Sequence, residues 1–102
     1  MIDITNISKN QPYLLFNKFY NKALNNNQKI IEAISISSYD KTKSEVNSRF
    51  VNLKYVIDQD WIFFTNYESR KAKQFLNHDQ VAATIFWNSI NVQIRMFAKI
   101  KK

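Results

Sequence analysis

The chain of 102 residues contains no glycine at all. Average usage of about 7% would give a chain of this length about seven glycines. Turns that need a positive φ angle must therefore fall mostly to asparagine and aspartate, which tolerate that conformation better than other residues. Asparagine is abundant, for example at residues 25–27, at Asn77 and at Asn88. The glycine-rich phosphate loops of P-loop and dinucleotide-binding proteins are excluded.

The composition indicates one folded domain over residues 1–102. Hydrophobic residues make up 45% of the chain and aromatic residues 15%, which is typical of a folded protein with a modest core. The absence of cysteine and the single histidine, His78, leave no thiolate or multi-histidine metal site, so we nominate no metal ligand. No apolar run reaches the ~20 residues of a membrane helix, and residues 1–5 lack signal-peptide features. We expect a cytoplasmic protein without a membrane partner.

The segment over residues 12–24 predicts an amphipathic helix. Pro12 suits the first helical position. Five apolar residues recur at helical spacing, and we assign them to core packing: Phe16, Phe19, Tyr20, Ala23 and Leu24. A second, short helix is expected to begin at Ser69, whose side chain can cap it. Residues 1–11 show no such pattern and are expected to be flexible.

Five segments predict β-strands because they alternate or are rich in β-branched residues. They cover residues 30–37, 48–57, 61–66, 81–87 and 92–100, with a loop over 39–47 and turns at 58–60 and 88–91. Short links favour antiparallel pairing, and strands of this kind curl into a small barrel. The predicted class is mainly β with two helices (α+β). Trp61 and Trp87 are assigned to packing and His78 to the surface.

Cationic side chains stand at the ends of several predicted elements: Arg49, Lys54, Arg70 and Lys71. A helix that opens near Ser69 adds free backbone N–H groups and a partial positive charge. This combination suits an anion, and a phosphate in particular. Alternation places Arg49, Val51 and Leu53 on one face of their strand. The same alternation places Phe50, Asn52 and Lys54 on the other face.

Four blocks of the sequence resemble the pyridoxamine 5′-phosphate oxidase family, in the family's order. Residues 49–54, Arg-Phe-Val-Asn-Leu-Lys, are similar to its Arg-x-Val-Leu-Leu-Lys run. Residues 63–71, Phe-Phe-Thr-Asn-Tyr-Glu-Ser-Arg-Lys, resemble its Phe-Tyr-Thr-Asn-x-x-Ser-Arg-Lys. Residues 86–87 and 92–95, Phe-Trp and Val-Gln-Ile-Arg, are similar to Phe-x-Trp and Arg-Gln-Val-Arg. Apolar pairs within residues 15–24 resemble the family's first helix.

The resemblance implies an FMN-binding split barrel that forms a homodimer with flavin mononucleotide (FMN) at the subunit interface. Carried over position by position, the cofactor contacts are Arg49, Phe50, Val51, Asn52, Leu53, Lys54, Phe64, Thr65, Arg70, Lys71 and Gln93. Arg49, Arg70 and Lys71 would hold the flavin phosphate, since arginine binds it through charge-assisted bonds. Lys54 would also contact the phosphate of the substrate.

The implied reaction oxidises a phosphorylated B6 vitamer, pyridoxamine or pyridoxine 5′-phosphate, to pyridoxal 5′-phosphate. A hydride passes from C4′ of the substrate to N5 of the flavin, and oxygen takes up the electrons as hydrogen peroxide. The flavin supplies this chemistry, and the protein supplies position and electrostatics. No side chain is an obvious general base, so we nominate no catalytic residue.

The chain departs from the family pattern at several positions. Phe64 replaces a tyrosine, Asn52 an apolar residue and Val92 an arginine. Family members also continue well beyond the point where this sequence ends, so the barrel is expected to be incomplete. Residues 92–100 would then form an open, apolar edge strand, unless dimerisation or another chain covers it.

Two other functions remain open on the sequence alone. The first is a non-catalytic flavin-binding remnant, or one half of a split enzyme that a partner chain completes. The second is a basic nucleic-acid-binding barrel, which rests on the net charge of +7 and on aromatic residues such as Tyr39, Tyr55 and Tyr67. No recognised nucleic-acid motif supports that second reading.

Overall fold

The computed structural model describes residues 1–65 and 78–101. The elements in chain order are β1 (Asp3–Thr5), α1 (Gln11–Asn25), β2 (Ala33–Asp40), β3 (Glu45–Asn52), β4 (Tyr55–Ile57), β5 (Asp60–Ile62), β6 (Gln80–Trp87) and β7 (Val92–Lys99). The second helix expected at Ser69 lies outside the described residues. None of the described helices is long and apolar enough to cross a membrane.

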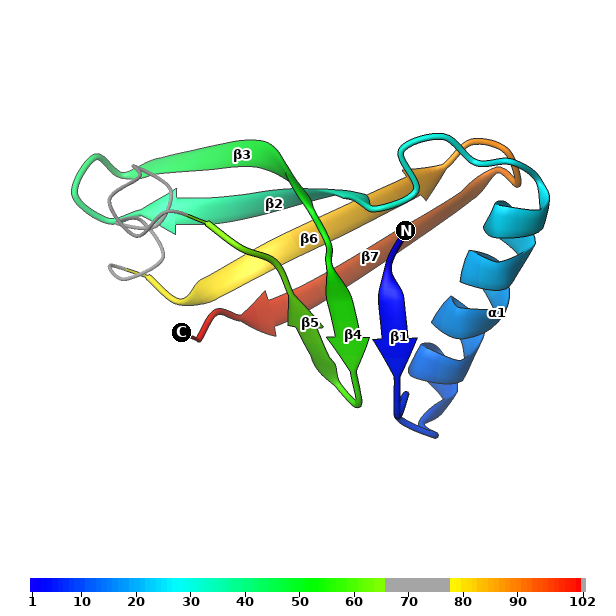
Figure 1. The fold of residues 1–102 in the computed structure, drawn as a ribbon. Coiled ribbons are helices and arrows are strands. Elements are labelled where there is room, and N and C mark those ends of the chain that lie inside the picture. Colours follow the sequence, from blue (N-terminus) through cyan, green and yellow to red (C-terminus); the bar gives the residue numbers. More distant parts are fainter. Residues whose placement is uncertain (66–77, 102) are drawn as a thin grey trace.

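The strands form two sheets that do not close into a barrel. The larger sheet is antiparallel and has the order β3-β2-β6-β7, whereas the smaller has the order β1-β4-β5. In the smaller sheet β1 runs parallel to β4 and β4 runs antiparallel to β5. Figure 1 shows the short strands crossing in front of the long ones, with α1 at one end of the molecule. The predicted mainly β class is confirmed, with one helix in the described part of the chain.

The helix α1 covers the core through its aromatic stripe, as its spacing predicts. Phe16, Tyr20 and Ala23 are buried, because they lie on one face of a helix that starts with Pro12 near its first position. The Phe16 ring centroid is 4.6 Å from that of Trp61 and 5.7 Å from that of Trp87. These contacts join the helix to both sheets.

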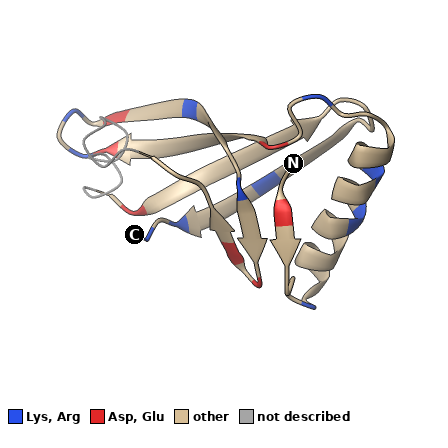
Figure 2. Ribbon diagram, in the orientation of Figure 1, with Lys and Arg blue, Asp and Glu red and all other residues tan. Residues whose placement is uncertain are grey.

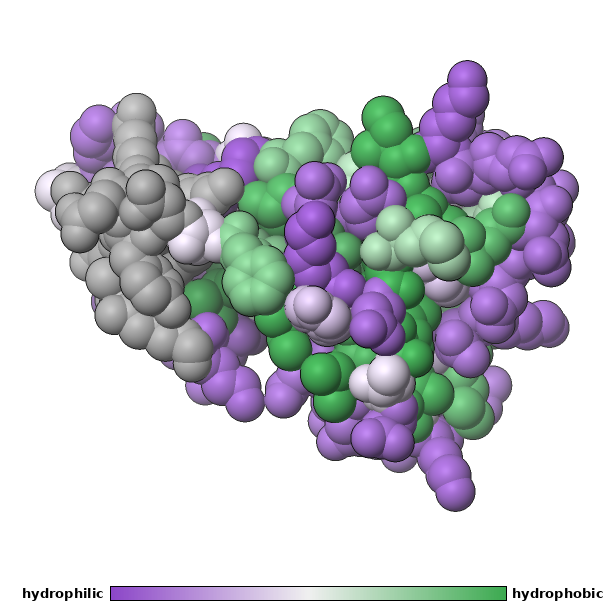
Figure 3. Space-filling view, in the orientation of Figure 1, coloured by the Kyte–Doolittle hydropathy of each residue, from purple (hydrophilic) through white to green (hydrophobic). Residues whose placement is uncertain are grey.

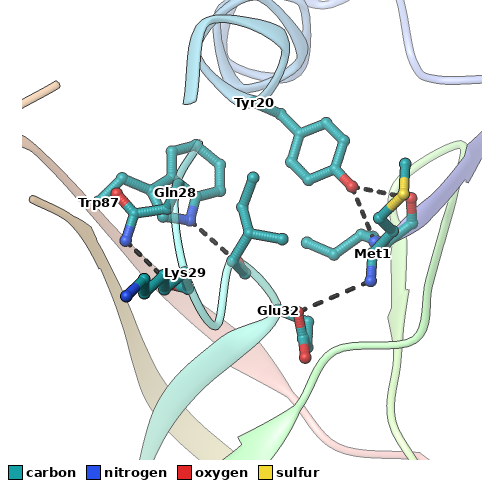
Figure 4. Close-up of polar contacts among 8 residues, drawn as sticks. Met1, Tyr20, Gln28, Lys29, Glu32 and Trp87 are labelled. Carbon is teal, nitrogen blue, oxygen red and sulfur yellow. Dashed lines mark hydrogen bonds and ion pairs between the residues drawn. The ribbon is translucent and has the colours of Figure 1, made fainter. Parts of the chain in front are cut away.

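The N-terminal segment contains a strand that the sequence pattern does not predict. Residues 1–11 are expected to be flexible, but β1 pairs with β4 and Ile2 is buried. The Tyr20 hydroxyl accepts a hydrogen bond from the Ile2 amide at 2.8 Å and donates one to the Ile2 carbonyl at 3.2 Å (Figure 4). The Met1 ammonium also lies 3.7 Å from the Glu32 carboxylate. A strand of three residues depends on such tertiary contacts more than on its own sequence.

Replacing Tyr20 with phenylalanine is expected to lower the free energy of unfolding by about 1–3 kcal/mol, because both buried polar groups of Ile2 lose their partner. Burial raises the pKa of the Tyr20 hydroxyl above its ordinary value of 10.0. The neutral hydroxyl therefore stabilises the fold fully below pH 10, and its contribution falls as the pH rises through the raised folded-state pKa. Urea unfolding at several pH values should show the difference between the two proteins shrinking above about pH 10. Tyr13→Phe, on the same helix, is the control for removal of a hydroxyl and should change the free energy of unfolding by less than about 0.5 kcal/mol.

The hairpin of β2 and β3 corrects two boundaries. The sequence predicts a strand at residues 30–37 and a loop at 39–47, but β2 extends to Asp40 and β3 begins at Glu45. The Asp40 side chain explains the short link, because its Oδ1 accepts hydrogen bonds from the backbone of Thr42 and Lys43 at 3.0 and 3.3 Å. Aspartate is common in turns, and for this reason the sequence pattern predicted a loop where the strand in fact continues to Asp40.

The predicted strand over residues 48–57 is two strands in the structure. β3 ends at Asn52 and β4 begins at Tyr55. Between them the Leu53 amide donates to the Glu32 carbonyl at 2.8 Å and the Lys54 amide donates to the Ile62 carbonyl at 2.9 Å. The chain therefore leaves the larger sheet and enters the smaller one at this point. The third predicted strand, over residues 61–66, corresponds to the shorter β5.

The bounds of the last two strands, and the residue types with positive φ, agree with the sequence predictions. β6 and β7 pair along their whole length, from Gln80↔Lys99 to Trp87↔Val92, and their predicted bounds are met within one residue. Most non-glycine residues with positive φ are asparagine or aspartate, as the absence of glycine predicts: Asn6, Asn27, Asp58 and Asn91. Ser44 and Ile30 are the exceptions among the described residues.

Ile30 is strained, because it has a φ of 51° and a β-branched side chain. Its side chain is exposed, so little packing depends on it. Replacing Ile30 with glycine is expected to raise the free energy of unfolding by about 0.5–1 kcal/mol, since relief of the strain exceeds the added entropy of the unfolded chain. Urea denaturation measures this gain. Lys29→Gly, at a neighbouring residue without positive φ, should instead lose about 0.5–1 kcal/mol.

Candidate functional site

Arg49 is half-buried on the inner face of β3, which faces the core. Its Nη1 donates to the Ser38 Oγ at 2.7 Å and to the Ile36 carbonyl at 3.3 Å. Burial lowers the pKa of the Arg49 guanidinium from its ordinary value, because partial removal from water disfavours the charged form. An anion bound beside Arg49 would offset this cost. The two hydrogen bonds fix the direction in which the guanidinium presents its charge.

The rest of the 49–54 segment divides between two faces as the alternation predicts. Val51 and Leu53 are buried with the core, whereas Phe50, Asn52 and Lys54 are exposed. β3 lies at the end of its sheet, so one edge of its backbone has no strand partner in the described part of the chain. That edge offers N–H and C=O groups to a ligand.

Lys54, Phe64 and Thr65 come together through the pairing of β4 with β5. The Lys54 amide donates to the Ile62 carbonyl, two residues before Phe64. The exposed ring of Phe64 meets the ring of Tyr55 edge-on at 6.1 Å. Thr65 follows and is half-buried. The structure thus places the ends of the two family-like blocks side by side.

Gln93 lies on the outer face of the larger sheet, the face that points away from the core. It is exposed on β7 opposite Phe86. The register Arg49↔Ile36↔Ala83↔Met96 lies on the inner face, so Arg49 and Gln93 are on opposite faces of the sheet. Arg70 and Lys71 lie outside the described residues. One copy of the chain therefore does not bring Arg49 and Gln93 to a common pocket.

The outer face carries large exposed aromatic side chains. Phe50, Phe86 and Phe97 are 75%, 58% and 78% exposed. The register Phe50↔Ser35↔Thr84↔Arg95 shows that Phe50 shares this face with β6 and β7. Figure 2 shows the described Lys and Arg residues spread over α1, the turns and both sheets rather than gathered in one patch. The unusual feature of this face is thus aromatic and not cationic.

Two polar residues that support Arg49 were not nominated from the sequence. Ser38 and Asp40 are 3% and 8% exposed; Ser38 accepts the Arg49 hydrogen bond and Asp40 closes the adjoining turn. Both continue the buried face of β2 begun by Ile34 and Ile36. This alternation of buried and exposed positions could have identified Ser38 and Asp40. The strand pattern is hard to recognise there, because the buried positions are polar.

An open groove lies between the two sheets. It has a volume of about 560 Å³ and is lined mainly by apolar side chains of β5, β6 and β7, among them Trp61, Val81, Met96 and Ala98. Phe64 and Thr65 lie at its rim. Figure 3 shows hydrophobic side chains filling the middle of the face over β1, β4 and β5. The predicted packing role holds for Trp87, which is fully buried, while Trp61 is half-buried and lines this groove.

Comparison with curated proteins identifies relatives of the chain, although no family model matches it. The pyridoxine/pyridoxamine 5′-phosphate oxidase of Pseudomonas syringae pv. tomato is 31% identical over 97 residues, and that of Colwellia psychrerythraea is 33% identical over 95. Each match covers 93% of this chain but only 45% and 43% of the relative. The chain thus spans less than half the length of these relatives.

Comparison with solved structures gives the fold. PhzG of Burkholderia lata, in complex with tetrahydrophenazine-1-carboxylic acid, matches with a TM-score of 0.80 and 18% identity, over 86% of this chain and 43% of that chain. A pyridoxamine 5′-phosphate oxidase-related, FMN binding protein of Nostoc punctiforme matches with a TM-score of 0.71 and 15% identity, over 82% and 46%. The fold is that of the split barrel, with its sheets left open. In sequence the chain is similar to part of the pyridoxine/pyridoxamine 5′-phosphate oxidases, and in fold it is similar to part of these two solved structures.

Proposed function

We propose that the chain binds FMN as a homodimer and serves as an oxidase of the pyridoxamine/pyridoxine 5′-phosphate type. The observation that supports this most is the 31% identity to such an oxidase across 93% of the chain. Because the chain spans only 45% of that relative, its activity, its substrate and its partner are all part of the proposal. A cytoplasmic location remains a prediction from the sequence.

The described residues fit an FMN molecule in three respects. The edge of β3 without a strand partner in the described part of the chain offers backbone donors and acceptors, which suits the ring edge of a flavin. Arg49 is held by Ser38 and is partly desolvated, which favours an anion such as the flavin phosphate. Lys54 and Phe64 are exposed at adjoining positions, where a ligand can reach them.

The proposed contacts divide by role. Arg49, with Arg70 and Lys71, would hold the flavin phosphate, and the 50–53 segment with Phe64, Thr65 and Gln93 would address the rest of the cofactor. Lys54 would also bind the phosphate of the B6 vitamer. Bound FMN would supply hydride acceptance and reoxidation by oxygen, chemistry that no side chain of this protein provides.

The division of the proposed site between two faces supports a homodimer. Arg49 and Gln93 lie on opposite faces of one sheet, so one ligand cannot easily contact both residues of the same copy. At a boundary between subunits it could contact Arg49 of one copy and Gln93 of the other. The exposed Phe50, Phe86 and Phe97 form an apolar surface of the kind that marks an interface. A second copy that covers the outer face would bury these rings and place Gln93 at the boundary between the subunits.

Titration of the purified chain with FMN tests the proposal. We expect saturable quenching of flavin fluorescence, and a mass in solution of twice the chain mass by light scattering. Gln93→Ala should weaken FMN binding by up to about tenfold, as loss of one hydrogen bond does. Ser89→Ala, in the β6–β7 turn of the same hairpin, is the control and should leave the affinity unchanged.

A turnover assay then separates the enzyme from a flavin-binding remnant. Peroxide formation from pyridoxamine 5′-phosphate at roughly 1–10³ s⁻¹, the usual range for enzymes, would support the oxidase activity. FMN binding without turnover would leave a flavin-binding remnant or half of a split enzyme. Absence of binding up to high micromolar FMN would overturn the proposal altogether.

A further inference from the structure

Asn47 lies on the inner face of β3, beside the proposed phosphate contact Arg49. The two residues are two positions apart, and side chains alternate between the faces of a strand, so they share a face. The register agrees, because Asn47 pairs with Ser38 and Arg49 pairs with Ile36, both of which are buried on β2. Ser38 Oγ also accepts a hydrogen bond from Arg49 Nη1 at 2.7 Å. Asn47 and Arg49 therefore both adjoin Ser38.

The side-chain amide of Asn47 is a buried donor without an acceptor. Its Nδ2 is buried and has no hydrogen-bond partner among the described residues. Most buried polar side-chain atoms in proteins have a partner, so an unpaired one needs an explanation. A buried donor that stays unpaired costs stability, and a bound ligand that supplies an acceptor recovers this cost.

The charges on either side of Asn47 indicate the kind of acceptor and its position. On one side, the guanidinium of Arg49 favours an oxygen that carries negative charge. On the other side, the next pair of the hairpin is Asp40 with Glu45, and their carboxylates disfavour an anion there. The two lysines of the turn come only after this pair in the hairpin. We therefore expect an anionic acceptor between Asn47 and Arg49.

A phosphate group suits both donors at once. Residues two positions apart on a strand are separated by about 6.6–6.8 Å. A donor lies about 2.9 Å from the oxygen that accepts its hydrogen bond, so donors about 6 Å apart can reach the oxygens of one phosphate. A neutral carbonyl or hydroxyl oxygen would satisfy Asn47 but would gain less from Arg49, because hydrogen bonds between charged groups are stronger.

We propose that Asn47 is a further contact of the flavin phosphate, to which its Nδ2 donates a hydrogen bond beside Arg49. The proposal rests on the proposed FMN site and adds a residue that precedes the family-like block over residues 49–54. A neutral amide fits this place, because it donates to the phosphate without adding a second cation that Arg49 would repel. Asn47 thereby contributes to the selection of FMN over riboflavin, which lacks the phosphate.

The affinities of the purified chain for FMN and for riboflavin test the proposal. Fluorescence titration with each flavin gives the ratio of the two affinities. Asn47→Ala is expected to weaken FMN binding by about tenfold to a hundredfold, the usual loss for a hydrogen bond to a charged group. It should leave riboflavin binding unchanged, so the ratio falls by the same factor. Asn21→Ala, at an exposed position of α1, is the matched control and should leave both affinities unchanged.

Two further measurements separate phosphate binding from a structural role of Asn47. Because its Nδ2 has no partner among the described residues, Asn47→Ala should not lower the urea concentration at the midpoint of unfolding without FMN. Asn47→Asp keeps the shape of the side chain but replaces the donor with a carboxylate. It should weaken FMN binding at least as much as Asn47→Ala does, because the carboxylate repels the phosphate, and should again leave riboflavin binding unchanged.

Two results would overturn the role of Asn47 and leave the proposed function standing. Equal losses of FMN and riboflavin affinity in Asn47→Ala would show that the residue acts through the fold and not through the phosphate. An unchanged FMN affinity in the same variant would show that the phosphate is held without it. Absence of FMN binding by the unaltered chain is a different result, because it overturns the proposed function itself and the role of Asn47 with it.

Discussion

Replacing Trp87 with alanine is expected to lower the free energy of unfolding by about 3–5 kcal/mol, the usual cost of deleting a large buried ring. Trp87 is fully buried and its ring packs against Phe16 and Tyr20 at centroid distances of 5.7 and 5.8 Å. Its Nε1 also donates to the Ile31 carbonyl at 2.9 Å (Figure 4). Such a loss is a large share of the roughly 5–15 kcal/mol that stabilises a domain. Urea denaturation followed by circular dichroism measures it.

Two further variants divide this effect. Trp87→Phe keeps much of the ring but leaves the Ile31 carbonyl unpaired, and should lose about 1–3 kcal/mol. Lys18→Ala, at an exposed position of α1, should change stability by less than about 0.5 kcal/mol. A loss of similar size in Trp87→Ala and Lys18→Ala would contradict the assignment of Trp87 to the core.

Replacing Arg49 with alanine is expected to weaken FMN binding by about tenfold to a hundredfold, because a charge-assisted hydrogen bond contributes about 1.5–3 kcal/mol. This expectation rests on the proposed flavin site. Arg49 is the described cation that its neighbours hold most firmly, through Ser38 and the Ile36 carbonyl. Fluorescence titration with FMN measures the change, and urea unfolding of the same variant shows how much stability is lost with it.

The matched control is Lys18→Ala, which removes a charge of the same sign from the exposed surface of α1. It should leave the FMN affinity within about twofold at physiological salt, since screening weakens distant charges. Arg49→Lys keeps the charge but loses the planar fork, and should retain part of the affinity. If Arg49→Ala and Lys18→Ala weaken FMN binding equally, the effect is one of net charge and Arg49 is not a phosphate contact.

The elements that sequence reasoning predicted well are those whose own pattern determines them. α1, β6 and β7 carry a long period of 3.6 or 2, and the structure has them within one residue or so of the predicted bounds. β1 and the break at Leu53 and Lys54 were missed. Both depend on partners far along the chain, Tyr20 for the first and Glu32 with Ile62 for the second. A local pattern contains no information about such partners.

The candidate site was predictable in its residue types but not in its arrangement. Alternation correctly separated Arg49 from Phe50, and the structure confirms that the two lie on opposite faces. The position of Gln93 relative to Arg49 required the strand order and register, which the sequence does not state. Ser38 and Asp40 were missed, because buried polar residues at the end of a strand resemble a loop until their hydrogen bonds are known.

The order of strands in the larger sheet also determines how the chain reaches its fold. β2 with β3 and β6 with β7 are hairpins that close over short turns, and hairpins of this kind form in about 1–10 μs. The central pair is different, since Ser35 must find Thr84 across nearly half of the chain. The entropy of closing that long loop is lost before the pairing is gained. We therefore expect the docking of two preformed hairpins to be the slow step, so that changes at the β2–β6 pairing alter the folding rate more than changes at either hairpin turn.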